Sequence, residues 1–306
     1  SPDRVTARAR ALGGWCGGVV CLALAVSLRA QAAPVAPRTP VDALFRALAL
    51  EDSSRYREAA QGYRLALEGD ASLDSDQQML ALLGFERVAS ELGLRDSVLA
   101  VIGRVLLRRP ADATAHAIRL RTLRAIGADA PRTREAMAMA DSMVRSAFVS
   151  WTQAAPRDPA PYREYTRLLL EQRRTAAADS VLQTGATALG DVAGVRTERA
   201  QVDALLGRWG AAGREWSAAV RTAPWNELAA LFSLQGARSS GRDSVRAALR
   251  AAREGARGDT VVVLARLLAR LELGWGEARG AWNAVESLAP GDSVVDLWRD
   301  GRAVGG

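Results

Sequence analysis

Apolar residues recur along much of this chain with the period of an α-helix. The pattern is clearest between residues 209 and 219, where two tryptophans and two alanines follow one another at steps of three, four and three residues. These steps place the four side chains along one side of a helix. Pro224 then stops the helix, since a proline has no amide hydrogen to donate. The four residues are Trp209, Ala212, Trp216 and Ala219.

The same steps recur towards the C-terminus, and Pro290 follows this second set at the distance at which Pro224 follows the first. The separation of the two sets corresponds to two periods of about 33 residues. In each set a small residue lets a neighbouring helix approach closely, and a tryptophan one turn further fills the space. Such a period predicts a stack of helical units. The second set is Trp275, Ala278, Trp282 and Val285.

These two units resemble the second helix of a tetratricopeptide (TPR) repeat, and a looser form of the pattern is present at Tyr56, Ala59 and Tyr63. The resemblance implies an all-α, right-handed solenoid of about seven TPR-like helical hairpins over residues 41 to 306. It also implies a groove, lined by the first helix of each hairpin, that binds partners. We expect nine residues to pack between successive hairpins: Ala59, Val98, Trp209, Ala212, Trp216, Ala219, Trp275, Ala278 and Trp282.

The N-terminal residues have the pattern of an export signal, with arginines before an uncharged run from Ala11 to Leu28 and small residues after it. Two alternatives are open. The run is removed by cleavage after Ala32, or it is kept as a signal anchor, because at about 1.5 Å per residue it is long enough to span a bilayer. Its glycines form overlapping Gly-x-x-x-Gly pairs, which favour packing against another membrane helix. They are Gly13, Gly14, Gly17 and Gly18.

Both alternatives predict a cytoplasmic start and a periplasmic or extracellular body, because the arginines precede the apolar run. We therefore divide the chain into three parts. Residues 1 to 32 are a signal anchor or signal peptide with one apolar helix at 11 to 28, residues 33 to 40 are a proline-rich linker, and residues 41 to 306 are the repeat domain. We also expect a capping helix at about residues 291 to 300, covering the last repeat.

Composition narrows the classes of function. All 41 basic residues are arginines, and the net charge of +7 is interleaved with Asp and Glu, which argues against nucleic-acid binding. Cys16 and Cys21 lie in the apolar run, so the repeats offer no thiol for a disulfide or a metal. His116 is the only histidine, and the repeats carry no Gly-rich phosphate loop. We expect no enzymatic activity, no cofactor, no metal site and no small-molecule substrate.

Residues that break the repeat are the candidates for binding. Tryptophan is enriched at the hot spots of protein interfaces, and Trp151, Trp225 and Trp298 fall outside the repeated positions. By the TPR resemblance, arginines of the first helices line the groove, where they suit acidic protein segments or lipid phosphates. The candidate arginines are Arg163, Arg167, Arg196 and Arg199.

Together these features predict a non-catalytic protein–protein interaction scaffold whose partners are other protein subunits. The specific hypothesis is an accessory structural subunit of a large inner-membrane complex, of the respiratory or photosynthetic reaction-centre and antenna type, with its repeats in the periplasm. Residues 11 to 28 then hold it in the inner membrane. The alternative is a soluble periplasmic adaptor in envelope assembly or secretion, cleaved near Ala32.

Overall fold

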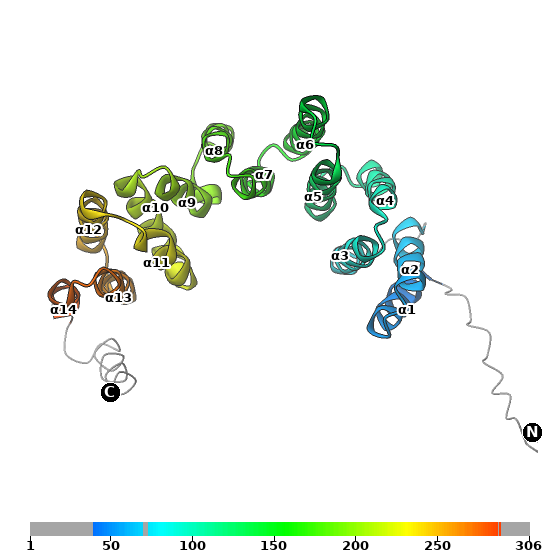
Figure 1. The fold of residues 1–306 in the computed structure, drawn as a ribbon. Helices are drawn as coiled ribbons and strands as arrows, with labels where there is room; N and C mark the ends of the chain where they lie inside the picture. The colour runs from blue at the N-terminus through cyan, green and yellow to red at the C-terminus, as the bar shows by residue number, and fades with distance from the viewer. Residues whose placement is uncertain (1–38, 70–72, 287, 289–306) are drawn as a thin grey trace, which may run out of the picture. The chain divides into compact units, whose positions relative to one another are not determined.

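The computed structural model describes residues 39–69, 73–286 and 288, and within these residues every regular element is a helix. Fourteen α-helices follow one another as seven consecutive helix–turn–helix pairs in the described residues, here called hairpins, together with the 3₁₀ helices η1 (Ala193–Val195) and η2 (Pro224–Asn226) (Figure 1). The all-α class is thereby confirmed for the described residues. The α-helices are α1 (Pro40–Asp52), α2 (Tyr56–Glu68), α3 (Ser75–Glu91), α4 (Arg95–Arg108), α5 (Ala113–Asp129), α6 (Arg134–Ala154), α7 (Ala160–Glu171), α8 (Thr175–Leu189), α9 (Arg196–Leu205), α10 (Trp209–Thr222), α11 (Glu227–Gln235), α12 (Ser239–Glu254), α13 (Asp259–Gly274) and α14 (Ala278–Glu286).

Several expected features lie outside the described residues. They are the apolar helix at 11 to 28 with its four glycines, the linker at 33 to 38, Trp298 and the capping helix at 291 to 300. Among the helices that the structure does describe, none combines the length and the apolar character needed to cross a bilayer.

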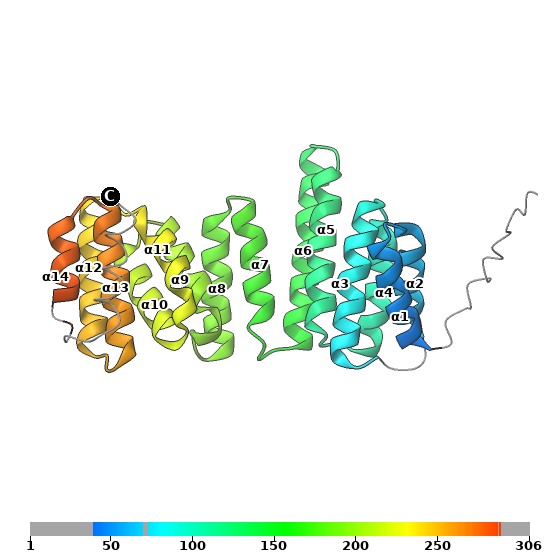
Figure 2. The same ribbon diagram turned by 90° about the horizontal axis from the view of Figure 1, so that it is seen from below.

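The hairpins are arranged in two layers. The odd-numbered helices, here called the first helices, form one layer, and the even-numbered second helices form the other (Figures 1 and 2). Most helix contacts join the two helices of one hairpin or those of neighbouring hairpins, and α10 also contacts α13, one hairpin further on. At one end of the layers, α5 and α6 extend beyond their neighbours (Figure 2).

Local sequence explains where the helices start and turn. Thr39 and Asp74 form capping boxes at α1 and α3, because their side chains accept hydrogen bonds from the amides of Asp42 and Gln77. After the first helix of a hairpin, the chain often turns through a left-handed residue such as Gly207, with φ 73°. Glycine adopts this conformation without steric cost. The equivalent turns use Ser54, Gly93, Arg173 and Gly276.

The core consists of three main clusters of buried apolar side chains, one in the N-terminal, one in the central and one in the C-terminal hairpins. Trp216 is fully buried in the C-terminal cluster, and Trp209 packs at its edge. The other residues that we expected between hairpins and that are buried are Ala59, Val98, Ala212, Ala219 and Trp275.

The expected packing fails at Ala278 and Trp282. Both are exposed, Trp282 at 54%. Two repeat units earlier, the matching Ala212 and Trp216 are buried, and α10 contacts α12 of the next hairpin. No further hairpin follows α14 within the described residues, so this side of α14 has nothing there to pack against.

Candidate functional site

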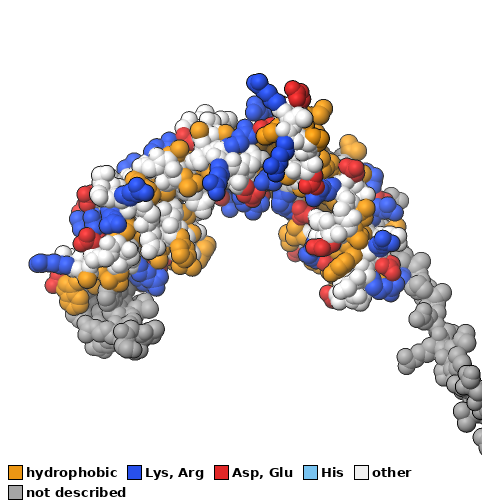
Figure 3. All heavy atoms as spheres, in the orientation of Figure 1, with side chains coloured by type: hydrophobic (Ala, Val, Ile, Leu, Met, Phe, Trp, Pro, Cys, Tyr) orange, Lys and Arg blue, Asp and Glu red, His pale blue; other side chains and the backbone are white. Residues whose placement is uncertain are grey.

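The clearest candidate for a binding surface is the exposed side of η2 and α11, in the sixth hairpin. Trp225, Leu228 and Phe232 are 82%, 56% and 70% exposed, respectively. Leu228 and Phe232, four residues apart, lie on one side of α11, and Trp225 lies in η2 three residues before Leu228. Figure 3 shows hydrophobic side chains gathered over this part of the stack. We call these three residues the α11 apolar strip. A contiguous exposed group of large apolar side chains marks an interaction site.

The opposite side of α11 holds the helix on the stack. Ala230 and Leu234 are fully buried in the C-terminal cluster, and Leu231 packs against it. The only charged residue of α11 is Glu227, at its start. A surface helix normally carries polar residues on its outer side. The composition of α11 is therefore that of a helix covered on both sides.

Glu227 is buried, and two arginines of α13 satisfy its carboxylate. The Nε atom of Arg266 donates to both carboxylate oxygens at 2.9 Å, and the Nη1 atom of Arg270 donates to Oε1 at 3.2 Å. A buried carboxylate requires such partners because it has lost its hydration. The bonds tie the start of α11 to α13, and so fix the apolar strip relative to that helix.

Two groups of arginines lie on α9 and on α13, the first helices that contact α11 on its two sides in the stack. On α9, Arg196 and Arg199 lie 3.3 and 4.0 Å from the carboxylate of Glu215 on α10. On α13, the two arginines described above share Glu227. In each group two guanidinium groups share one carboxylate, so one positive charge is not compensated within the group.

The arginines of the more N-terminal first helices pair with carboxylates, often on a neighbouring hairpin. Arg121 donates to Glu86 at 2.9 and 2.7 Å, and this hydrogen bond raises the pKa of Arg121. Arg163 donates to Glu198 at 3.0 Å, and Arg167 pairs with a glutamate of its own helix. The expected arginine-lined groove is thus, over α5 and α7, a surface of charges that largely compensate one another.

Trp151 was expected to contact a partner, and that expectation is wrong because its ring is fully buried. It stacks on His116, with ring centroids 5.3 Å apart and an interplanar angle of 6°. The Nε2 atom of His116 donates to the carbonyl oxygen of Pro110 at 2.8 Å. Burial lowers the pKa of His116, against the opposing effect of this hydrogen bond. His116 is therefore a core residue packed against Trp151.

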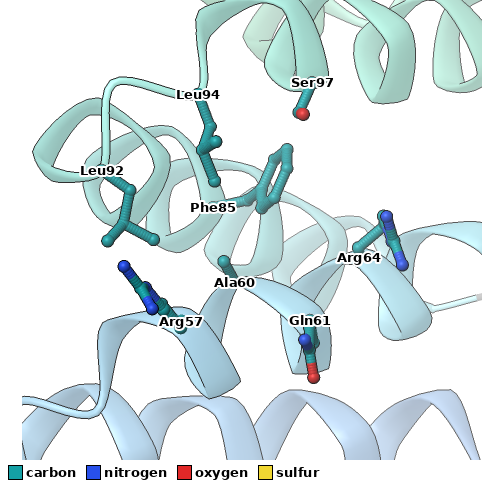
Figure 4. Close-up of a pocket in the computed structure, with 8 residues that line it drawn as sticks. All are labelled: Arg57, Ala60, Gln61, Arg64, Phe85, Leu92, Leu94 and Ser97. Atoms are coloured by element: carbon teal, nitrogen blue, oxygen red, sulfur yellow. The ribbon is translucent and has the colours of Figure 1, made fainter.

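A second surface feature is an open hollow of about 390 Å³ between α2, α3 and the start of α4 (Figure 4). Phe85, Leu92 and Leu94 supply its apolar lining, and Arg57 and Arg64 border it from α2. This combination suits a ligand that joins an apolar group to an anion. Both arginines are exposed, so the hollow excludes water less well than an enclosed binding site.

Sequence reasoning identified Trp225 but missed Leu228 and Phe232. The available signal was the run from Leu228 to Phe232, which is apolar at every position and leaves no polar side for water. An apolar run of this kind reads as a buried helix, and only the structure shows that one side lies open. A less exposed group of the same type lies on α3: Met79, Leu80 and Leu83.

Seven stacked hairpins in the described residues define the class: this is a helical-repeat protein. The chain is similar to a thermophilic TPR protein of Thermus thermophilus, with a TM-score of 0.43 and 19% sequence identity, over 64% of this chain and 99% of that chain. It is also similar to a TPR protein of Parabacteroides merdae, with a TM-score of 0.40 and 10% identity, over 84% of this chain and 96% of that chain. No family model and no curated protein matches the chain.

Proposed function

We propose that this chain is a non-catalytic protein–protein interaction scaffold, and that the α11 apolar strip is its main contact with a partner. The observation that carries the proposal is the exposure of Trp225 on η2 and of Leu228 and Phe232 on α11, a helix whose other side is buried. Covering such a surface is favourable by about 25 cal/mol per Å² of apolar area removed from water. A tryptophan and a phenylalanine together are typical anchors of a protein interface.

We further propose that the scaffold is an accessory structural subunit of a large inner-membrane complex, with its repeats in the periplasm. The support is the sequence pattern of residues 1 to 32, in which arginines precede an apolar run that carries Gly-x-x-x-Gly pairs. A respiratory or photosynthetic reaction-centre and antenna complex suits this arrangement. The alternative is a soluble periplasmic adaptor in envelope assembly or secretion, with the signal removed near Ala32.

The membrane part of the proposal is tested in the full chain by substituting Gly14→Leu and Gly18→Leu together. Large side chains there prevent close helix packing, so the untagged protein should lose its co-purifying subunits in mild detergent. Gly103→Leu is the matched control, because Gly103 is exposed and a Cβ atom added there meets no heavy atom within 4 Å. Unchanged co-purification of the double variant contradicts the proposal. A mature N-terminus at Ala33, measured by mass spectrometry, selects the soluble adaptor instead.

A further inference from the structure

We infer that the α11 apolar strip binds an amphipathic α-helix of a partner protein, and that acidic residues border the apolar face of that helix. The inference rests on the proposed scaffold function and names the chemistry of the partner. Three observations carry it: the geometry of the strip, the hydrogen bonding of the helix that bears it, and the charges on both sides.

The geometry of the strip matches the side of another helix. From Trp225 to Phe232 the strip spans seven residue steps, or roughly 10 Å at about 1.5 Å per residue. Two turns of a partner helix present apolar residues over the same length, at positions i, i+3 or i+4, and i+7. Because Leu228 and Phe232 project from α11 and Trp225 from η2 directly before it, the three side chains can interdigitate with such a row.

Backbone pairing offers no alternative mode of recognition at this place. A peptide in extended conformation adds to the edge of a sheet, where unpaired amide and carbonyl groups are available to a partner. The described residues contain no strand, and α11 is an α-helix from Glu227 to Gln235 whose backbone groups bond within the helix. The partner must therefore be recognised by side chains, which favours a helix with a defined apolar face.

The charges around the strip indicate the sign of the charge that the partner carries. The acidic residues on α9, α11 and α13 are Glu198, Asp203, Glu227 and Glu272, whose side chains are at most 17% exposed and ion-paired, and Asp259, which is exposed at the far start of α13. The arginines of α9 and α13 remain 24% to 45% exposed. The accessible charge beside the strip is therefore mainly positive.

This charge also decides between occupants. A second copy of the chain would bring the same arginines face to face, and like charges brought together in an interface are costly. An anionic bilayer typically attracts clusters of four to eight freely accessible basic residues, whereas each group of arginines here is already engaged by a carboxylate. Glutamate or aspartate beside the apolar row of a partner helix complements both groups at once.

The test uses the full chain in mild detergent and a synthetic helical peptide. The peptide is two to three helical turns longer than the two turns that contact the strip. The peptide carries Leu and Phe at i, i+3 and i+7, with Glu on both borders of this face. We expect it to bind, and we expect the variant Leu228→Ser/Phe232→Ser to bind it about 30-fold more weakly. Leu107→Ser is the matched control, because Leu107 is 83% exposed on α4 and lies outside the strip.

Matched peptides test the two parts of the recognition. Replacing the bordering Glu residues by Lys should weaken binding at least about 10-fold, and a scrambled peptide without an apolar face should not bind. Equal binding of the three peptides, or equal binding to wild type and the strip variant, overturns the inference. So does strip-dependent binding of phosphatidylglycerol vesicles in place of the peptide, or strip-dependent dimerisation.

The outcome is separable from the test of the membrane anchor. If Gly14→Leu/Gly18→Leu leaves co-purification unchanged while the strip variant loses the acidic peptide, the membrane proposal fails and this inference stands. If the glycine variant releases the protein from its complex while the peptides bind without preference, the inference fails and the membrane proposal stands.

Discussion

Helices α7 and α11 hold equivalent places in the stack, yet they present opposite surfaces. Both are first helices and both bury apolar residues on their inner side, such as Leu169 on α7 and Leu234 on α11. On the outer side α7 presents Arg163 and Arg167, whereas α11 presents the apolar strip. The buried side of a first helix is enough to stack it in the repeat. The residues on its exposed side are therefore free to differ according to the partner.

The two helices also differ in how their charges are used. The ion pair of Arg163 with Glu198 on α9 lies at the surface, where solvent screens it and side-chain entropy opposes it. The pair of Arg266 with Glu227 involves a buried carboxylate. On α7, charge serves mainly the solvated surface, and on α11 it fixes the helix that carries the strip.

The largest expected effect separates the two sides of α11. Leu234→Ala should lower the free energy of unfolding by roughly 2–5 kcal/mol, because it leaves a cavity in the C-terminal cluster. Phe232→Ala, only two residues earlier, should change it by no more than about 0.5 kcal/mol. Urea unfolding followed by circular dichroism measures both. Equal losses would mean that Phe232 is packed in solution, which contradicts an open strip.

A smaller difference is expected between the charges of the two helices. Arg266→Ala should cost roughly 2 kcal/mol, since Glu227 stays buried with only Arg270 as a partner. Arg163→Ala should cost at most about 1 kcal/mol, because its ion pair is exposed. The measurement is again denaturant unfolding, now at low and high salt. If high salt reduces the loss of stability caused by Arg266→Ala and by Arg163→Ala to the same extent, the distinction between buried and surface pairing is wrong.

The smallest effect concerns α5, next to α7, where His116 stacks on Trp151. The pKa of His116 in the folded protein lies below the ordinary value of 6.5. As the pH falls, the imidazole is therefore protonated in the unfolded chain before it is protonated in the folded protein. The contribution of this group to stability is full above pH of about 6.5 and falls as the pH is lowered towards the folded pKa. His116→Phe keeps an aromatic ring but does not titrate. The wild type should therefore lose more stability than the variant between pH 7 and 5.5; identical thermal-melting profiles would contradict this.

The repeat itself was predictable because it is local. Steps of three and four residues between Trp209, Ala212 and Trp216 are read directly along one helix, and they repeat because every hairpin has to pack against the next. The fate of individual side chains depends on contacts far along the chain. The buried ring of Trp151 stacks on His116, which lies 35 residues earlier in the chain, and no local sequence pattern predicts that contact.

The binding surface was predictable only in part, for the same reason. Trp225 stood out as a tryptophan outside the repeat, but Leu228 and Phe232 lie in an apolar run that is typical of a buried helix. Arg163 stood out as a charge on a first helix, while its partner Glu198 lies on the next hairpin. Which side of a helix stays open, and which charge is compensated, are properties of the assembled stack.

The contact of α10 with α13 has a consequence for how the protein can come apart. A linear array joined only through adjacent units can lose them one at a time from an end. Since α10 belongs to the fifth hairpin and α13 to the seventh, their contact joins these two hairpins directly, across the sixth. The last three hairpins are therefore cross-linked into one cooperative block, and α11 sits inside it. A partner that pulls on the strip loads this block as a whole rather than peeling away a single hairpin.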